Sequence, residues 1–264
     1  MKKYFVIGNP IAHSQSPKLH NYWIKNNNIK AIYRKKKLTK SEIKNFLTKI
    51  KKKDISGANV TVPYKSLIIP YLDKLSPEAE ETQSVNTICY ENNLLVGYNT
   101  DITGFSKAIK KTNFKINNKK IFILGAGGVV PSIICALNNM KVSKIILSNR
   151  TREKATSLKK KFKNVDTIEW GKLPEFDVII NATSLGLKKN DNLRIDFSDI
   201  GKNKLFYDVI YNPKETNFLK YGKKLGNKSE NGKLMFVYQA SESFKLWHGI
   251  RPNINKETNL LLDL

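Results

Sequence analysis

The stretch Lys120-Ile121-Phe122-Ile123-Leu124-Gly125-Ala126-Gly127-Gly128 decides the fold of this chain. Its apolar run leads directly into a glycine-rich turn, which predicts a buried strand over 120–124. An apolar helical segment at about 129–139 and a second apolar strand at 144–148 follow. A strand, glycine turn, helix and strand within about thirty residues are typical of a dinucleotide-binding βαβ unit.

Strands and helices also alternate on either side of this unit, which predicts an α/β protein. Strands at 177–180 and 205–209 extend the middle of the chain into a doubly wound parallel sheet. A new domain begins near Ile102, and the residues from Leu234 onward have an amphipathic helical pattern that could pack on either domain. The expected strands of the first hundred residues are 3–8, 32–34, 58–62 and a hairpin of 86–90 with 94–97. The expected helices there are 16–27, 39–52, 66–72 and one that begins at Ser76-Pro77.

Three local patterns predict where helices start. Ser16 followed by Pro17 is expected to be an N-cap with proline in the first turn, and Thr39 with Glu42 forms a capping box. Pro131 is tolerated after the glycine turn because it falls in the first helical turn, where N–H groups have no helical partners.

Composition and charge limit the classes of function. The chain has 264 residues, 40% hydrophobic, without a long apolar segment, so we expect a globular cytoplasmic protein that has no membrane partner. Its two cysteines lie in apolar segments. The net charge is +25, but of the 47 basic residues only five are arginine, leaving 42 lysines spread along the chain. This distribution favours a solvated basic surface over a nucleic-acid site, since base readout depends on arginine.

The choice of cofactor is predicted from the segment after the second strand of the βαβ unit. Gly125 permits the tight turn and Gly127 lets backbone N–H groups approach a pyrophosphate, although Val130 stands where a third glycine is usual. An acidic residue after the second strand would hold the ribose of NAD. This chain instead has Arg150, whose guanidinium suits the 2′-phosphate of NADP. The alternative is that Arg150 only forms a salt bridge with a helix.

A nicotinamide enzyme that reduces a ketone needs a proton donor and groups that hold the substrate. The first domain offers polar residues in four clusters: residues 8–17, 59–65, 84–87 and 97–101. The second cluster presents Thr61 and Lys65 at the end of a strand, and the fourth ends at Asp101, at the domain boundary where a cleft would open.

These residues resemble the shikimate dehydrogenase family over nearly the whole chain. The later motifs are 208–213 with Thr216, and 231–232 followed by Met235, Gln239-Ala240, Phe244 and Trp247. The resemblance implies NADPH-dependent reduction of 3-dehydroshikimate, with Lys65 and Asp101 as the catalytic pair. The physics agrees, because the Lys65 ammonium would stabilise the developing alkoxide and Asp101 would orient it. Whether Lys65 itself transfers the proton, or steadies charge while water or Asp101 does so, stays open. It implies that the substrate is bound by Ser14, Ser16, Thr61, Lys65, Asn86, Asp101, Tyr211 and Gln239. For the cofactor it implies Gly125, Ala126, Gly127, Gly128, Asn149, Arg150, Thr151, Thr183, Ser184, Gly232 and Met235.

The resemblance also implies the domain plan: residues 1–101 plus 233–264 form a substrate-binding domain, and residues 102–232 form a Rossmann-type NADP-binding domain. The C-terminal helices would thus return to the first domain. Gln83-Ser84 departs from the small residues usual in the family before Val85. We expect no metal, because three separated histidines and two cysteines lack ligand spacing.

Three alternatives remain open. The chain could be a monomer or a homodimer. It could be a quinate/shikimate dehydrogenase of broader specificity, a type that tends to use NAD, or a non-catalytic regulatory or polyanion-binding protein on the same fold.

Overall fold

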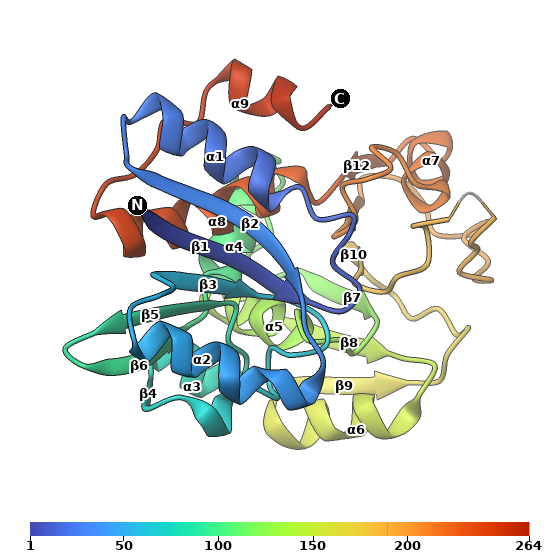
Figure 1. The fold of residues 1–264 in the computed structure, drawn as a ribbon. Helices are drawn as coiled ribbons and strands as arrows, with labels where there is room; N and C mark the ends of the chain where they lie inside the picture. The colour runs from blue at the N-terminus through green and yellow to red at the C-terminus, as the bar shows by residue number, and fades with distance from the viewer. Residues whose placement is uncertain (189, 264) are drawn as a thin grey trace. The chain divides into compact units, whose positions relative to one another are not determined.

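The computed structural model describes residues 1–188 and 190–263. The chain divides into two compact units: unit 1 comprises Met1–Gly104 with Val237–Leu264, and unit 2 comprises Phe105–Phe236. Each unit has its own six-stranded sheet (Figure 1). No helix in the described residues is long and apolar enough to cross a membrane.

The sheet of unit 1 is mixed, with the strand order β2-β1-β3-β5-β6-β4. Strand β1 is parallel to β2 and β3, whereas β5 is antiparallel to β3 and β6. Asn92 and Asn93, both at positive φ, make the turn of the predicted β5–β6 hairpin. The strands are β1 (Lys2–Gly8), β2 (Ala31–Lys37), β3 (Gly57–Val60), β4 (Lys74–Leu75), β5 (Thr87–Glu91) and β6 (Leu94–Tyr98).

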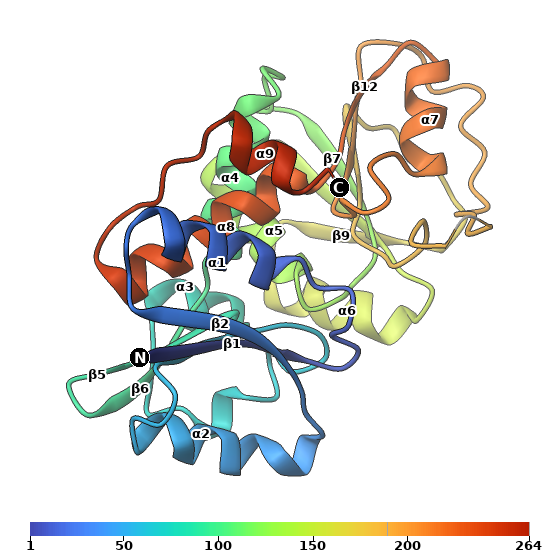
Figure 2. The ribbon, with the colours of Figure 1, turned by 45° about the horizontal axis from the view of Figure 1, so that its top comes forward.

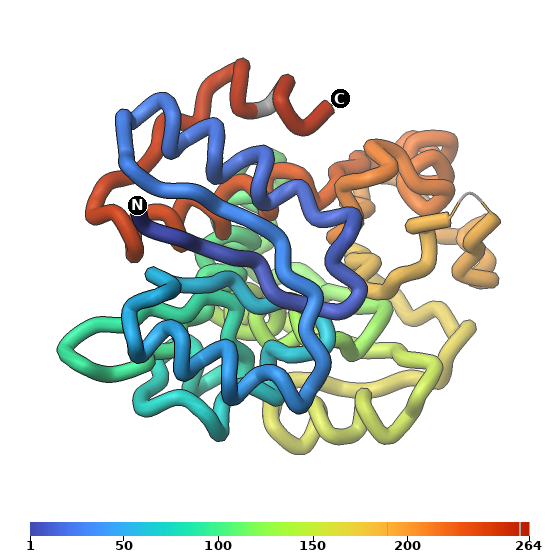
Figure 3. Tube along the Cα trace, in the orientation of Figure 1, coloured from blue at the N-terminus to red at the C-terminus, as the bar shows by residue number. Residues whose placement is uncertain are grey.

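Helices cover both faces of this sheet. Because side chains alternate along β1, Tyr4 stacks on Trp247 of α8 at 4.8 Å, while Phe5 meets the ring edge of Phe46 in α2 at 6.0 Å. Figure 2 shows α1 and α2 on opposite sides of β1 and β2, and Figure 3 follows the C-terminal segment alongside α1. The helices are α1 (Ser16–Asn26), η1 (Lys40–Glu42), α2 (Ile43–Lys51), η2 (Ile69–Tyr71), α3 (Pro77–Thr82), α8 (Lys233–His248, in unit 1 from Val237) and α9 (Lys256–Leu261).

Two local predictions for unit 1 are wrong. The expected helix over 66–72 is only the short 3₁₀ turn η2, whose Pro70 has no N–H to donate to an α-helical ladder. Helix α1 begins one residue early: Gln15 precedes it, Ser16 is already helical, and the Ser16 side chain does not cap the backbone. The capping box at Thr39 and the N-cap at Ser76 are confirmed. Strand β4 was not predicted.

The sheet of unit 2 is entirely parallel, with the order β12-β11-β10-β7-β8-β9. Strands β7 and β8 have the predicted bounds, and β9, β12 and helix α7 were not predicted. The strands are β7 (Lys120–Leu124), β8 (Lys144–Ser148), β9 (Val165–Ile168), β10 (Val178–Asn181), β11 (Leu205–Asp208) and β12 (Lys228–Glu230).

Helices also pack on both faces of the parallel sheet. Phe206 packs against Phe218 of α7 at 5.1 Å, whereas its neighbour Tyr207 meets Phe105 of α4 at 5.3 Å. Pro131 lies in the first turn of α5, as predicted. The helices are α4 (Asp101–Lys111, in unit 2 from Phe105), α5 (Val130–Asn139), α6 (Arg152–Lys161) and α7 (Asn217–Lys224). The predicted doubly wound α/β fold is confirmed.

Candidate active site

Lys65 and Asp101 form a buried ion pair in unit 1. Lys65 Nζ lies 2.5 Å from Asp101 Oδ2, and the two side chains are 11% and 7% exposed. Asp101 is the first residue of α4, where the partial positive charge of a helix N-terminus favours a carboxylate. Lys65 is anchored through its carbonyl, which accepts a hydrogen bond from the N–H of Val85. Two residues 36 positions apart are thus brought into contact by the chain fold.

Asn86 joins this pair to Gln239. The Asn86 amide nitrogen donates to Asp101 Oδ1 at 3.1 Å and to Gln239 Oε1 at 3.2 Å. The Asn86 amide oxygen accepts from the N–H of Thr100 at 2.8 Å. Lys65, Asp101, Asn86 and Gln239 therefore form one connected group of polar side chains from four segments of unit 1. Such a group can hold substrate hydroxyls next to an ammonium.

Ser14 and Ser16 lie together at the start of α1. The Ser14 hydroxyl donates to Ser16 Oγ at 3.2 Å and accepts from the Ser16 N–H at 3.3 Å. Burial raises the pKa of the Tyr33 hydroxyl, and the nearby Ser16 side chain acts in the opposite direction. The two hydroxyls thus stand at a helix N-terminus, the environment that suits a carboxylate.

Thr61 lies directly after β3, beside the end of β1. Its N–H donates to the carbonyl of Ile7 at 2.9 Å. A Cβ on Gly8 would come within 2.5 Å of Thr61 Cγ2, so the glycine permits this close approach. Among the described residues, Thr61 makes no side-chain hydrogen bond to the Lys65–Asp101 pair.

In unit 2, the predicted cofactor residues gather at the carboxyl edge of the parallel sheet. Gly125 follows β7 at φ +108°, and a Cβ there would lie 2.7 Å from the carbonyl oxygen of Ala182, which follows β10. Only glycine therefore fits this turn. Ala126, Gly127 and Gly128 continue the loop into α5, and Gly127 and Gly128 are exposed. This open loop at a helix N-terminus fits the pyrophosphate of a dinucleotide.

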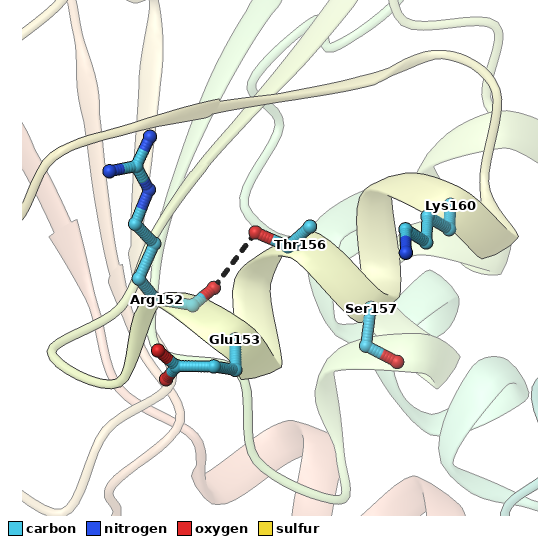
Figure 4. A pocket seen from close by; sticks show the side chains of 5 residues that line it. All are labelled: Arg152, Glu153, Thr156, Ser157 and Lys160. Atoms are coloured by element: carbon cyan, nitrogen blue, oxygen red, sulfur yellow. Dashed lines mark hydrogen bonds between the residues drawn. The ribbon is translucent and has the colours of Figure 1, made fainter.

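Arg150 follows β8 and is exposed. It makes no ion pair with any residue in the described parts of the chain, which argues against a purely structural salt bridge. The Asn149 amide donates to the Thr151 carbonyl at 2.7 Å and so shapes the turn that carries Arg150. Figure 4 shows a shallow groove on the adjoining helix α6, lined by Arg152, Glu153, Thr156, Ser157 and Lys160. The side chains here fit a phosphate group.

The loop with Thr183 and Ser184 is built on Asn181, a residue that sequence reasoning missed. Asn181 Oδ1 accepts from the Thr183 N–H at 3.1 Å and from the Thr183 hydroxyl at 2.7 Å. The Asn181 amide nitrogen donates to Asp208 Oδ1 at 3.1 Å. Its place at the end of a buried strand in a parallel sheet was the available signal. Ser184 is exposed, and its side chain makes no hydrogen bond within residues 1–188 and 190–263.

Asp208 is a buried carboxylate behind this loop. Burial raises the pKa of Asp208 to about 6, although hydrogen bonds from Thr216, the Ile210 N–H and Asn181 act in the opposite direction. The Thr216 hydroxyl donates to Asp208 Oδ2 at 2.6 Å. Asp208 thus ties the Thr183 loop to the start of α7 through Asn181 and Thr216.

Gly232, Met235 and Tyr211 complete the predicted residues of unit 2. A Cβ on Gly232 would lie 2.1 Å from the Val209 carbonyl oxygen, so no other residue fits there without a backbone shift. Met235 is buried in the first turns of α8, and Tyr211 stacks on Phe236 at 4.6 Å. Tyr211 belongs to unit 2, whereas Ser14 and Ser16 belong to unit 1.

Two of the three histidines, His20 and His248, pack against aromatic rings. His20 is buried between aromatic rings and stacks on Tyr33 at 4.3 Å, and burial lowers the pKa of His20 to about 3. His13 is exposed, and His248 packs on Phe244 at 4.3 Å. Within residues 1–188 and 190–263, the structure brings together no group of three metal-ligating side chains. Both cysteines are buried free thiols.

Comparison with known proteins decides the family. Residues 6–88 match the model described as shikimate dehydrogenase substrate binding domain, and residues 106–208 match the model described as shikimate / quinate 5-dehydrogenase. A relative from Pelagibacter ubique (strain HTCC1062), named shikimate dehydrogenase (NADP(+)), is 56% identical over 100% of both chains. The chain belongs to the shikimate dehydrogenase family.

Solved structures of shikimate dehydrogenases have the same fold. The enzyme from Aquifex aeolicus is 36% identical with a TM-score of 0.90, and the match covers 99% of this chain and 97% of that one. A shikimate dehydrogenase solved in complex with NADP⁺ is 34% identical with a TM-score of 0.89, covering 100% and 95%. The family resemblance drawn from the motifs is therefore confirmed.

Proposed function

We propose that this chain catalyses the reversible NADPH-dependent reduction of 3-dehydroshikimate to shikimate, a step towards chorismate and the aromatic amino acids. The observation that carries the proposal is the buried Lys65–Asp101 pair, connected to Asn86 and Gln239. It occurs in a chain whose 56% identical relative is named an NADP-dependent shikimate dehydrogenase. Both the enzyme class and the cofactor expected from the sequence agree with these comparisons.

The two parts of the chain bind different ligands. Residues 1–101 with 233–264 bind the substrate, and residues 102–232 bind NADP. The family model that matches residues 6–88 is described as a substrate binding domain, which supports the first assignment. The parallel sheet with its glycine loop supports the second.

Hydroxyl and amide groups of unit 1 position the substrate. Ser14 and Ser16, at the start of α1, receive the substrate carboxylate, and Tyr211 of unit 2 assists them. The ring hydroxyls are bound by Thr61, Asn86, Asp101 and Gln239. The neutral hydroxyls and amides orient the substrate, while the ion pair supplies charge close to the ketone.

The chemical step needs stabilised charge on the carbonyl oxygen. Bound NADPH supplies the hydride that forms the new C–H bond. The Lys65 ammonium stabilises the alkoxide as the C=O π bond becomes an oxygen lone pair, and Asp101 holds the ammonium in place at 2.5 Å. The proton then comes to that oxygen from the Lys65 ammonium, either directly or by way of Asp101 or a water molecule that first receives it. Lys65 lowers the barrier in each of these routes, so its removal affects turnover more than binding.

The carboxyl edge of the sheet in unit 2 holds NADP. The loop of Gly125, Ala126, Gly127 and Gly128 binds the pyrophosphate, and Asn149, Arg150 and Thr151 bind the adenosine phosphate. Thr183, Ser184, Gly232 and Met235 line the nicotinamide side. Two observations support NADP over NAD. The exposed guanidinium of Arg150 forms no ion pair within the described residues, and its sequence neighbours Asn149 and Thr151 are not acidic.

The enzyme acts in the cytoplasm as a monomer or homodimer, with small molecules as its ligands and without nucleic acid or metal. The two reduced, buried cysteines fit a reducing compartment.

The decisive experiment crosses shikimate and quinate with NADP⁺ and NAD⁺ and follows reduced nicotinamide by absorbance. Shikimate with NADP⁺ should be oxidised fastest by a wide margin. Comparable oxidation of quinate, or equal rates with NAD⁺, would support the broader quinate/shikimate dehydrogenase instead. Absence of turnover in all four reactions, with DNA or heparin binding that persists at moderate salt, would favour the non-catalytic alternative.

A further inference from the structure

A buried hydroxyl network lies behind the Lys65–Asp101 pair, and Ser243 is at its centre. Ser243 is fully buried on α8, one helical turn after Gln239. Its Oγ lies 2.9 Å from the Asn59 amide nitrogen, 2.8 Å from Thr87 Oγ1 and 3.2 Å from Thr100 Oγ1. It also lies 3.1 Å from the carbonyl oxygen of Gln239. One hydroxyl therefore joins β3, β5, the start of α4 and α8.

The direction of these hydrogen bonds follows from counting protons. The Thr100 hydroxyl accepts from the Asn86 amide nitrogen at 2.8 Å, so its single proton is free to point to Ser243. The Asn59 amide nitrogen is a donor, so it fills the other acceptor position of Ser243. Ser243 then donates its own proton to Thr87 or to the Gln239 carbonyl. Every hydrogen-bonding position of the Ser243 hydroxyl is thereby occupied.

This order adds a second constraint on the orientation of the Asn86 amide, which the backbone N–H of Thr100 also holds. With the Thr100 proton directed at Ser243, Thr100 Oγ1 presents a lone pair to Asn86. The Asn86 oxygen is held by the Thr100 N–H and by the Thr87 hydroxyl at 3.1 Å, so the amide cannot turn over. Its nitrogen must therefore face Asp101 Oδ1, which leaves Oδ2 for Lys65. A flipped amide would place an oxygen against the carboxylate.

We propose that Ser243 is a positioning residue for the reaction: by accepting the Thr100 proton, it sets the Asn86 amide and, through it, the Asp101 carboxylate that holds Lys65. This inference deepens the function proposed above and rests on it. Ser243 does not touch the substrate itself. Its influence passes through Thr100 and Asn86, and it also fixes the register of α8 that carries Gln239.

The network also extends towards the two serines at the start of α1. Asn59 Oδ1 accepts from the Tyr33 hydroxyl at 2.7 Å, and the Ser16 side chain is near enough to that hydroxyl to act on its pKa. Buried polar groups are costly unless all are paired, so a chain of them is retained only where it orders a site. It lies between the residues proposed for the carboxylate and those proposed for the ketone.

The test compares Ser243→Ala with Ser241→Ala, which removes a second buried hydroxyl from the same helix but none of the bonds described above. Ser243→Ala should lower kcat about tenfold with little change in the KM for shikimate, because the reacting groups lose alignment. Ser241→Ala should match the wild type. Thermal unfolding of each variant shows whether it folds.

Thr100 gives a second route to the same bond. Thr100→Val should reproduce the loss in kcat, whereas Thr100→Ser, which keeps the hydroxyl, should retain most of the activity. The Ser243→Ala/Thr100→Val double variant should be no slower than the slower of the two single variants, because each already lacks the Thr100–Ser243 bond. Thr100→Val is expected to be the slower one, since it also loses the bond from Asn86. Additive losses, or a Ser243→Ala enzyme with wild-type kcat, would overturn the proposal.

Nuclear magnetic resonance separates this inference from the proposed function. The side-chain ¹⁵N–¹H resonances of Asn86 should shift and exchange faster in Ser243→Ala, and stay unchanged in Ser241→Ala. If wild-type enzyme does not oxidise shikimate, the proposed function fails while this measurement still decides the hydrogen-bond order. Unchanged Asn86 resonances in Ser243→Ala would refute the positioning role even in an active enzyme.

Discussion

The site in unit 1 and the cofactor edge in unit 2 are built in opposite ways. In unit 1 the reacting pair is 11% and 7% exposed and is held by side chains that hydrogen-bond one another. In unit 2 the glycine loop and Arg150 are largely exposed, and backbone geometry does most of the positioning. Chemistry on a ketone requires charge at a fixed place, whereas a nucleotide phosphate is bound by N–H groups and a mobile guanidinium.

Removing the charge at the centre of the unit 1 network should have the largest effect. Lys65→Ala is expected to lower kcat by about three orders of magnitude, since both alkoxide stabilisation and a proton donor are lost. The KM for shikimate should change little, because hydroxyls and amides hold the substrate. Steady-state kinetics measure both constants. A Lys65→Ala enzyme with a large rise in KM and normal kcat would show that Lys65 serves binding instead.

Asp208→Asn tests whether the stability of unit 2 depends on the ionisation of a buried side chain. The folded protein holds the Asp208 proton more tightly than the unfolded chain, since the pKa rises from 3.8 to about 6. Its contribution to stability is therefore complete below pH 3.8 and is lost as pH rises through about 6. At 1.36 kcal/mol per pKa unit, this loss amounts to about 3 kcal/mol.

Urea unfolding of the wild type and Asp208→Asn between pH 4 and 7 measures this contribution. The wild type should lose stability relative to the variant as pH rises, because the amide buries no charge. Its oxygen can accept the bonds from Asn181 and Ile210, and its nitrogen would donate to the Thr216 hydroxyl. Asp196→Asn is the control in the same unit: Asp196 is exposed, and hydrogen bonds from Ser198 lower its pKa below 3.8, so the difference from the wild type should stay nearly constant between pH 4 and 7. A pH-independent difference for Asp208→Asn would contradict the buried charge.

Arg150→Ala tests the exposed cofactor edge. Loss of the guanidinium should weaken NADP⁺ binding by about 1 to 3 kcal/mol, the range for charge-assisted hydrogen bonds, and leave NAD⁺ binding unchanged. Isothermal titration calorimetry with both nucleotides provides the comparison. Arg152→Ala, which removes a cation from the neighbouring groove on α6, should have a smaller effect. Equal losses for NADP⁺ and NAD⁺ would mean that Arg150 does not read the 2′-phosphate.

Sequence predicted the elements with strong local patterns and missed those that depend on neighbours. The βαβ unit at 120–148 has the predicted strands because apolar runs and a glycine turn are unambiguous. Strands β9 and β12 were missed because short, polar edge strands carry little pattern of their own. The helix expected over 66–72 failed because Pro70 supplies no N–H for an α-helical ladder, and of the apolar residues there only Ile68 is fully in the core.

The candidate site shows the same division. Motifs identified the residues that carry charge, and the structure places Lys65 beside Asp101. The residues that hold them were harder to find, since Ser243 and Asn181 become important only through contacts with distant segments. Ser243 is 184 positions from Asn59 in sequence, and a serine in an amphipathic helix has no local feature that marks such a role.

A change in ionic strength should have the smallest effect of these tests, and it should affect the cofactor edge of unit 2 more than the Lys65–Asp101 pair of unit 1. Between about 0.05 and 0.5 M salt, the Kd for NADP⁺ should rise several-fold, because exposed charges are screened over a Debye length of about 10 Å or less. This rise should be smaller in Arg150→Ala, which has lost the screened interaction. The kcat at saturating substrate should change little, since the Lys65–Asp101 pair is shielded from ions by burial. A kcat that falls in parallel with nucleotide affinity would mean that solvent ions reach the pair, and the contrast between an interior reaction site and an exposed cofactor edge would not hold.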